Sequence, residues 1–136
     1  MTLYYRIRNF FVYGWDSLHR RCQRFIRGYA WSDVWNMYGW FMLTIEPMLI
    51  HLRNNHIGVP MEFENNPEGW DAVLDEMIAC LKLMDEDNAY EYFGFGDYES
   101  YSRMTKEDHE NIYSTMENNK NRFFELFSKY FYNLWD

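Results

Sequence analysis

The chain has 136 residues and a formal net charge of −8, and 21% of its residues are aromatic. This length suits one domain, residues 1–136, with a sizeable hydrophobic core. The acidity argues against direct binding to DNA or RNA, whose phosphates attract positively charged surfaces. The 6 Trp, 12 Tyr and 11 Phe exceed what one small core can hide, so we expect some rings at an interface or pocket.

The first predicted helix covers about residues 2–27. Its apolar residues recur at steps of three and four, at Tyr4, Ile7, Phe11, Trp15, Leu18, Cys22, Phe25 and Tyr29. Gly28 is expected to end this helix, and Ser32 or Asp33 to cap the next one. Because Cys22 and Cys80 lie in apolar helical patterns, we predict that both thiols are buried.

The start of the chain is basic, whereas the remainder is acidic. Before residue 31, six arginines stand against Asp16 alone, a net charge of +5. From residue 31 onward, 7 Lys and Arg stand against 20 Asp and Glu, a net charge of −13. This asymmetry favours packing of the basic segment against acidic neighbours, in the same molecule or in a second subunit. The alternative is an anion or phosphate site made by Arg20, Arg24 and Arg27, which share one helix face.

The stretch from Trp31 to Leu52 predicts a core helix over about residues 33–54. Its apolar residues step by four and three, at Val34, Tyr38, Phe41, Ile45, Met48 and Leu52. Pro47 removes one backbone donor. We expect a kink there, since the apolar stripe keeps its phase beyond the proline. Residues 56–66, with a glycine, a proline and paired asparagines, predict a loop.

A third helix is predicted over about residues 67–85. Asn66 and Pro67 give a strong start signal, because they combine a capping side chain with proline at the first helical position. Acidic residues from Asp85 onward oppose the helix dipole, so we expect the end of this helix to fray.

A fourth helix is predicted over about residues 106–134. Thr105 and Asp108 resemble a capping box at its start. The four segments together predict an all-α fold, a bundle of about four helices.

Residues 85–104 are unusual because six aromatic residues alternate there with acids and two glycines. One interpretation is a loop whose rings fold back over the bundle. The other is a recognition surface, in which tyrosines give rigid contact area and the acids select a basic partner. The candidate binding residues of this surface are Tyr90, Tyr92, Phe95 and Tyr98.

The sequence contains no recognisable pattern of metal ligands or catalytic residues. The four histidines show no zinc-ligand spacing, and two cysteines without a CxxC motif are insufficient. A carboxylate-bridged metal site in a bundle would use Glu-x-x-His, whereas His51 follows Glu46 by five positions. We therefore expect no cofactor, no metal and no catalytic residue. A metal-dependent enzyme remains a remote alternative.

Three aspartates near helix starts or tryptophans need a separate interpretation. We interpret Asp33, Asp71 and Asp75 as helix caps or as partners of the helix dipole. The alternative is a small-ligand site between subunits, formed where a kinked second helix leaves a cavity.

Three segments resemble a group of small uncharacterised proteins encoded by tailed bacteriophages. These segments are WSDVWN (31–36), PEGWDAVLDEMI (67–78) and ELFSKYFYNLWD (125–136). The resemblance covers most of the chain from Trp31 onward. It implies a phage or prophage setting and an all-α architecture, and it brings no catalytic residue.

These features predict a non-enzymatic phage accessory protein that self-associates as a homo-oligomer. We expect it to bind and inhibit a host protein, such as a defence or nucleic-acid-processing factor. The alternative is a sponge for a small nucleotide ligand, which Arg20, Arg24 or Arg27 would bind together with stacked rings. No signal peptide is evident, and the longest uncharged apolar run, residues 34–45, is too short to span a bilayer. We therefore expect a protein of the host cytoplasm that does not bind membranes.

Overall fold

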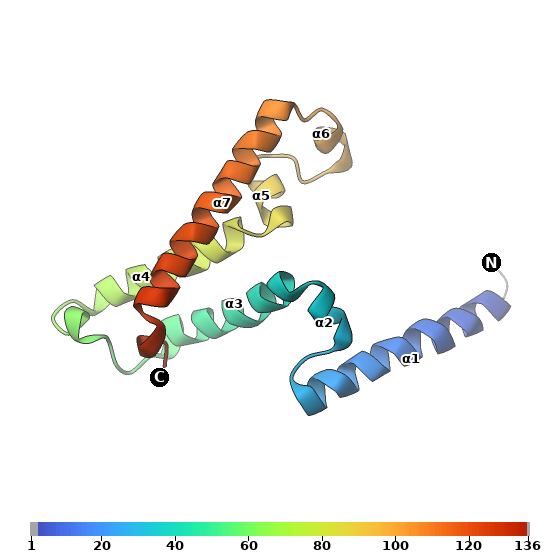
Figure 1. The fold of residues 1–136 in the computed structure, drawn as a ribbon, viewed down its shortest axis with the longest axis horizontal. Coiled ribbons are helices and arrows are strands. Elements are labelled where there is room, and N and C mark those ends of the chain that lie inside the picture. The colour runs from blue at the N-terminus through green and yellow to red at the C-terminus, as the bar shows by residue number, and fades with distance from the viewer. Residues whose placement is uncertain (1–2, 136) are drawn as a thin grey trace. The chain divides into compact units, whose positions relative to one another are not determined.

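The computed structural model describes residues 3–135, and the side chains of residues 14–135. Over this range the fold contains seven α-helices, two short 3-10 helices and no β-strand (Figure 1). The all-α prediction is confirmed, but the expected count of about four helices is wrong. The chain divides into two compact units, Met1–Phe41 and Met42–Asp136. The expectation of one domain stays a prediction.

The first unit contains α1 (Leu3–Arg27) and α2 (Trp31–Trp35). Gly28 ends α1 with a φ of +79°, in the left-handed region that favours glycine. Its N–H donates to the Arg24 carbonyl at 2.9 Å. The predicted helix over residues 2–27 and its stop at Gly28 are therefore confirmed from Leu3 onward.

Asp33 ties α2 to the end of α1. One carboxylate oxygen accepts hydrogen bonds from the Ala30 N–H at 2.8 Å and from Arg24 Nε at 3.0 Å, and the other accepts from Arg24 Nη2 at 2.5 Å. The Trp31 N–H donates to Gln23 Oε1 at 2.9 Å beside this pair. The bonds from Arg24 and then from Ala30 lower the pKa of Asp33 from its ordinary 3.8 to about 2. Asp33 thus caps α2, as predicted, and also pairs with a cation.

The predicted helix over residues 33–54 is instead two helices, α2 and α3 (Met37–Asn55), which separate at Asn36. Asn36 has φ −131° and ψ 62°, and its Oδ1 accepts a hydrogen bond from the Gly39 N–H at 3.0 Å. A short polar side chain that bonds to the backbone competes with helical hydrogen bonds and caps the new helix. α3 runs through Pro47 to Asn55, and the expected kink at Pro47 is not confirmed.

The core of the second unit lies between α4 (Pro67–Leu83) and α7 (Lys106–Lys129), and α5 (Glu86–Tyr92) packs against both (Figure 1). The largest fully buried side chains are Trp70, Leu74, Met77, Leu81, Ile112 and Phe123. All six belong to α4 or α7. The core is therefore centred on these two helices and not, as predicted, on the stretch from Trp31 to Leu52. In that stretch Val34, Tyr38 and Met48 are exposed.

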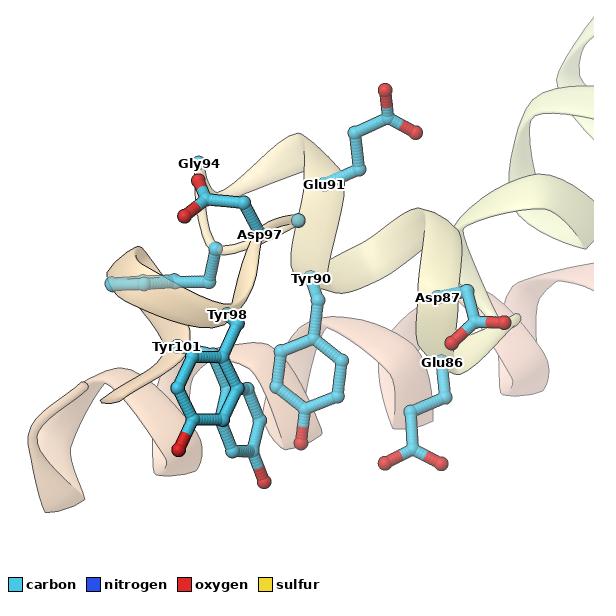
Figure 2. A pocket seen from close by; sticks show the side chains of 10 residues that line it. Glu86, Asp87, Tyr90, Glu91, Gly94, Asp97, Tyr98 and Tyr101 are labelled. Atoms are coloured by element: carbon cyan, nitrogen blue, oxygen red, sulfur yellow. The ribbon is translucent and has the colours of Figure 1, made fainter. Parts of the chain in front are cut away.

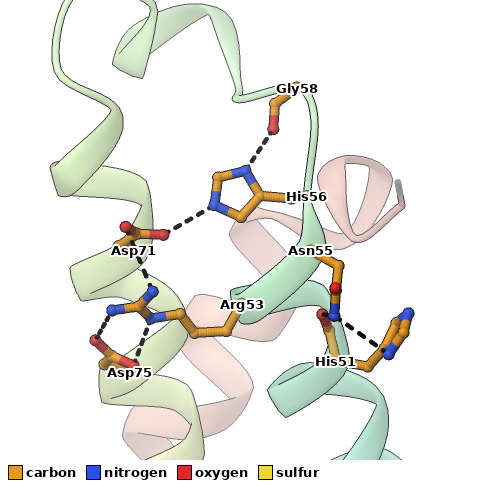
Figure 3. Close-up of polar contacts among 7 residues, drawn as sticks. All are labelled: His51, Arg53, Asn55, His56, Gly58, Asp71 and Asp75. Carbon is orange, nitrogen blue, oxygen red and sulfur yellow. Dashed lines mark hydrogen bonds and ion pairs between the residues drawn. The ribbon is translucent and has the colours of Figure 1, made fainter.

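Charged side chains join the second half of α3 to α4 (Figure 3). Arg53 donates to both oxygens of Asp75, at 2.9 and 3.2 Å, and lies 3.5 Å from Asp71. His56 places Nε2 2.8 Å from Asp71 and Nδ1 3.1 Å from the Gly58 carbonyl. The interpretation of Asp71 and Asp75 as caps is therefore wrong, because both pair with side chains from the end of α3 or just beyond it.

Residues 85–104, for which a loop was one interpretation, contain two short helices, α5 and α6 (Tyr98–Ser102). Asp85 accepts a hydrogen bond from the Asn88 N–H at 3.1 Å and so caps the start of α5. Asp97 accepts from the N–H groups of Glu99 and Ser100 at 2.9 and 3.0 Å and caps α6. The acids expected to fray the end of a helix instead start the next one, where the helix dipole favours them.

The remaining boundaries agree with the sequence in part. The loop after α3 contains a 3-10 helix, η1 (Met61–Phe63), and Asn66 makes no side-chain cap for α4. The capping box of Thr105 and Asp108 is confirmed, with the Thr105 N–H 2.8 Å from Asp108 Oδ2. α7 ends at Lys129 and is followed by a second 3-10 helix, η2 (Phe131–Asn133).

The two cysteines differ in burial. Cys80 is buried, as predicted, whereas Cys22 is exposed, like Leu18 and Phe25 beside it on α1. Across residues 3–135, no helix combines the length and the apolar character that crossing a membrane requires.

Leu74→Ala is expected to lower the free energy of unfolding by about 2–5 kcal/mol, because the truncation leaves a cavity in the α4–α7 core. Leu43→Ala is the matched control, since Leu43 is 78% exposed. We expect the control to change stability by less than about 0.5 kcal/mol. Urea unfolding followed by circular dichroism measures both variants, and equal losses would contradict this placement of the core.

Asp33→Asn is expected to destabilise the α1–α2 junction at neutral pH. The folded-state pKa of Asp33 is lowered, so its ionised form stabilises the junction fully above 3.8, and this stabilisation fades as the pH falls to about 2. The difference in helicity and thermal stability between wild type and variant should shrink over that interval. Asp16→Asn, which alters an exposed pair with Arg20, is the control and should change helicity and thermal stability little at neutral pH.

Candidate functional site

An open hollow of about 880 Å³ lies between α5, α6 and the segment that joins them (Figure 2). It is lined by Glu86, Asp87, Tyr90, Glu91, Gly94, Phe95, Gly96, Asp97, Tyr98 and Tyr101. Four of these residues carry a carboxylate, four carry an aromatic ring, and none carries a positive charge. We name this site the acidic aromatic hollow.

The turn between α5 and α6 shapes the hollow. Gly94 adopts a φ of +84°, and its N–H donates to the Glu91 carbonyl at 3.0 Å. The Phe95 N–H donates to the Tyr90 carbonyl at 2.8 Å. These two bonds form a Schellman motif, which closes α5 and turns the chain back. Asp97 then starts α6, so two short helices present their side chains to one space.

Tyr90 anchors the ring cluster of the hollow. Its ring meets that of Tyr101 edge-on with centroids 5.5 Å apart, and that of His109 in α7 at 6.4 Å. Tyr101 also meets His109 edge-on at 6.1 Å. Burial, followed by the nearby carboxylate of Glu86, raises the pKa of the Tyr90 hydroxyl. The rings of Tyr90 and Tyr101 are thus held against His109 of α7 before any ligand binds.

The carboxylates of the hollow differ in how they are held. Asp97 accepts bonds from two backbone N–H groups and from the Ser100 hydroxyl, and these bonds lower the pKa of Asp97. In the part of the chain with described side chains, no cation forms an ion pair with Glu86, Asp87 or Glu91. Figure 2 shows Glu86 on the same side as the tyrosine rings, whereas Glu91 points away from them. Three carboxylates of the hollow therefore have no ion-pair partner among residues 14–135.

This combination of groups suits a cationic ligand group. Aromatic faces attract ammonium and guanidinium ions through the ring quadrupole, and unpaired carboxylates attract the same ions by charge. Tyrosine adds rigid contact area at low cost in conformational entropy. A lysine or arginine side chain of a partner protein has the required chemistry.

Three of the four predicted aromatic site residues, Tyr90, Phe95 and Tyr98, line the hollow. Tyr92 does not line it; its ring is exposed and packs edge-on against Phe93 at 5.4 Å. Sequence reasoning missed Tyr101 and Glu86. The pairs Tyr98–Tyr101 and Glu86–Tyr90 have helical spacings of three and four, which become informative once this segment is known to be helical.

The three predicted arginines lie in the first unit, and acids already engage two of them. Arg24 pairs with Asp33, and Arg20 Nη2 lies 3.1 Å from Asp16. Arg27 places its guanidinium 5.7 Å from the centre of the Tyr29 ring. A phosphate site there would have to displace these carboxylates, so the nucleotide hypothesis gains no support from this geometry.

Metal ligands do not assemble in the described part of the chain. Among its residues, no group of three or more His, Cys, Asp and Glu side chains could hold a metal ion. This includes the carboxylates of the acidic aromatic hollow, which point in different directions (Figure 2).

Comparison with known proteins adds no relative. No family model, no curated protein and no solved structure matches the chain. The resemblance to phage proteins therefore stays a prediction, and the candidate site depends on its own geometry.

Gly94→Ala is expected to destabilise the protein by about 1–2 kcal/mol, because the left-handed conformation strains an L side chain. A Cβ at Gly94 would meet no atom within 4 Å, so the backbone alone causes the loss. Gly58→Ala is the control, since its Cβ also meets nothing and its φ is not positive. Chemical unfolding compares the two, and an equally stable Gly94→Ala variant would contradict the Schellman turn.

Proposed function

We propose that this chain is a non-enzymatic bacteriophage accessory protein that acts in the host cytoplasm by binding a basic host protein. The acidic aromatic hollow receives lysine or arginine side chains of that partner. The observation that carries the proposal is the lining of the hollow, which has four carboxylates and four rings but no cation. The phage setting is taken from the sequence resemblance.

The net negative charge of the second unit indicates a basic partner. Residues 42–136 contain 7 Lys and Arg against 19 Asp and Glu, a net charge of −12. Proteins that process nucleic acids carry positive surfaces for phosphate groups. An acidic protein competes for such a surface by charge complementarity, which raises the association rate and selects the partner. A defence or nucleic-acid-processing factor fits this description, and occupation of its basic surface would inhibit it.

The aromatic rings of the hollow contribute binding free energy that its carboxylates alone do not provide. Surface ion pairs contribute little net free energy, and salt screens them. Tyrosines at the centre of an interface commonly contribute much of its binding energy. Tyr98 is the most accessible ring of the hollow, whereas Tyr90 is held against Tyr101 and His109. We therefore assign first contact to Tyr98 and the floor of the hollow to Tyr90.

Titration with short arginine and lysine peptides tests the cationic specificity. We expect amide and ring NMR signals of Tyr90, Tyr98 and Tyr101 to shift, and a glutamate peptide to cause no shift. Tyr98→Ala should weaken binding about tenfold, since a cation–π contact contributes about 0.5–2 kcal/mol. Added salt should weaken binding further.

Tyr113→Ala is the matched control for Tyr98→Ala. Tyr113 is 68% exposed on α7 and does not line the hollow. Equal losses of peptide affinity in the two variants, or signal shifts confined to other helices, would refute the assignment of the hollow.

A photoreactive amino acid in place of Tyr98 tests the host partner. Cross-linking in host cells should capture a basic protein, and the purified protein should inhibit the activity of that partner at equimolar concentration. The same label in place of Tyr113 should not capture it. Capture of acidic proteins only, or binding without inhibition, would contradict the proposal.

A further inference from the structure

The first unit presents an apolar helix face on α1. Five side chains lie within about one third of the helix circumference at about 100° per residue, namely Trp15, Leu18, Cys22, Phe25 and Ile26. All five are exposed, and Phe25 is 93% exposed. α2 is bonded to the other side of α1, through Gln23 and Arg24. An amphipathic helix requires cover for its apolar face, and α2 does not provide it.

The second unit presents an apolar hollow of about 560 Å³, distinct from the acidic aromatic hollow. Its wall comes from the second half of α3 and from the C-terminal segment, and includes Pro47, Met48, Phe127, Phe131, Leu134 and Trp135. Met48 is 60% exposed, and Phe131 and Trp135 are also exposed. His51 is the one ionisable residue in its lining. This site suits aliphatic and aromatic side chains.

Charge favours a second copy of this chain over a membrane or a nucleic acid as the occupant. Residues 1–41 contain six arginines against Asp16 and Asp33, a net charge of +4, whereas residues 42–136 carry −12. An anionic membrane or a nucleic acid would attract the first unit but repel the second. A second copy of this chain instead offers the first unit both an apolar hollow and opposite charge.

The border of the apolar face adds a specific contact. Arg21 lies next to Leu18 and Phe25 around α1, and no ion pair holds its side chain among residues 14–135. Glu46 adjoins Ile45 and Pro47 of the apolar hollow in sequence, and its ion pair with Lys82 Nζ is long, at 3.8 Å. In the docked complex, Arg21 would therefore approach Glu46, whose own ion pair with Lys82 is long.

We propose that the apolar face of α1 in one copy packs into the apolar hollow of a second copy. The exchange is reciprocal, so the two contacts are equivalent and close a two-fold dimer. Phe25 enters the hollow beside Met48, and Arg21 lies at its acidic edge. This dimer does not depend on the acidic aromatic hollow, which lies elsewhere in the second unit.

Light scattering of the purified full chain at micromolar concentration tests the dimer. We expect twice the chain mass of 16.9 kDa. Phe25→Glu on α1 and Met48→Glu in the hollow should each give monomers, because each places a charge in the apolar contact. Tyr113→Glu, at an exposed aromatic residue of α7 outside both surfaces, should leave the dimer intact. Circular dichroism should show that all three variants keep their helical content.

Mixing the two monomeric variants tests the exchange itself. A Phe25→Glu chain keeps its hollow and a Met48→Glu chain keeps its α1, so the mixture should recover a dimer with one intact contact. A Met48→Glu variant that dimerises alone would show pairing of α1 with α1 and overturn the proposal. A monomeric wild type would also overturn it, whether or not it binds phosphatidylglycerol vesicles. Tyr98→Ala should stay dimeric, so failure of the proposed partner binding is distinguishable from failure of this dimer.

Discussion

The packing of α4 against α7 is the constraint on which the second unit depends. Trp70 lies at one end of this contact, with ring centroids 5.2 Å from Tyr130 and 6.0 Å from Phe63. This cluster joins α4, η1 and the end of α7, while Lys129 pairs with Glu62 of η1 at 3.4 Å. Toward the other end of α4, α5 packs against both helices. The core thus fixes the base of the acidic aromatic hollow at one end and the C-terminal wall of the apolar hollow at the other.

Acidic side chains have two roles in this architecture. Asp85 and Asp97 start α5 and α6, and Asp97 also lines the acidic aromatic hollow. Asp33, in the first turn of α2, accepts a hydrogen bond from the Ala30 N–H and pairs with Arg24. Some acidic residues, such as Asp97, therefore both cap a helix and contribute to the negative surface. Substitutions that reduce the charge of such residues also weaken local structure, so partner binding is better examined through rings such as Tyr98.

The sequence predicted the helices whose apolar period is long and uninterrupted, namely α1, α4 and most of α7. It did not predict the break at Asn36, because a single side chain that bonds to the backbone overrides a continuing apolar stripe. It also missed the pairing of Arg53 with Asp75, which are 22 positions apart and meet only through the fold. For the candidate site, the aromatic composition of residues 85–104 indicated three of the lining rings. Glu86 and Tyr101 were missed because their spacing has meaning only on helices.

The uneven burial of the indole rings has a spectroscopic consequence. Trp70 is 1% exposed, whereas Trp15, Trp31, Trp35 and Trp135 are exposed and Trp40 is half-buried. Indole emission shifts to longer wavelength in water, so Trp31 and Trp35, which are exposed and lie outside both surfaces of the proposed dimer, emit much as they do in the unfolded state. Trp70 emits at shorter wavelength because it is buried. Acrylamide therefore quenches Trp31 and Trp35 and leaves Trp70 as a reporter of the α4–α7 core.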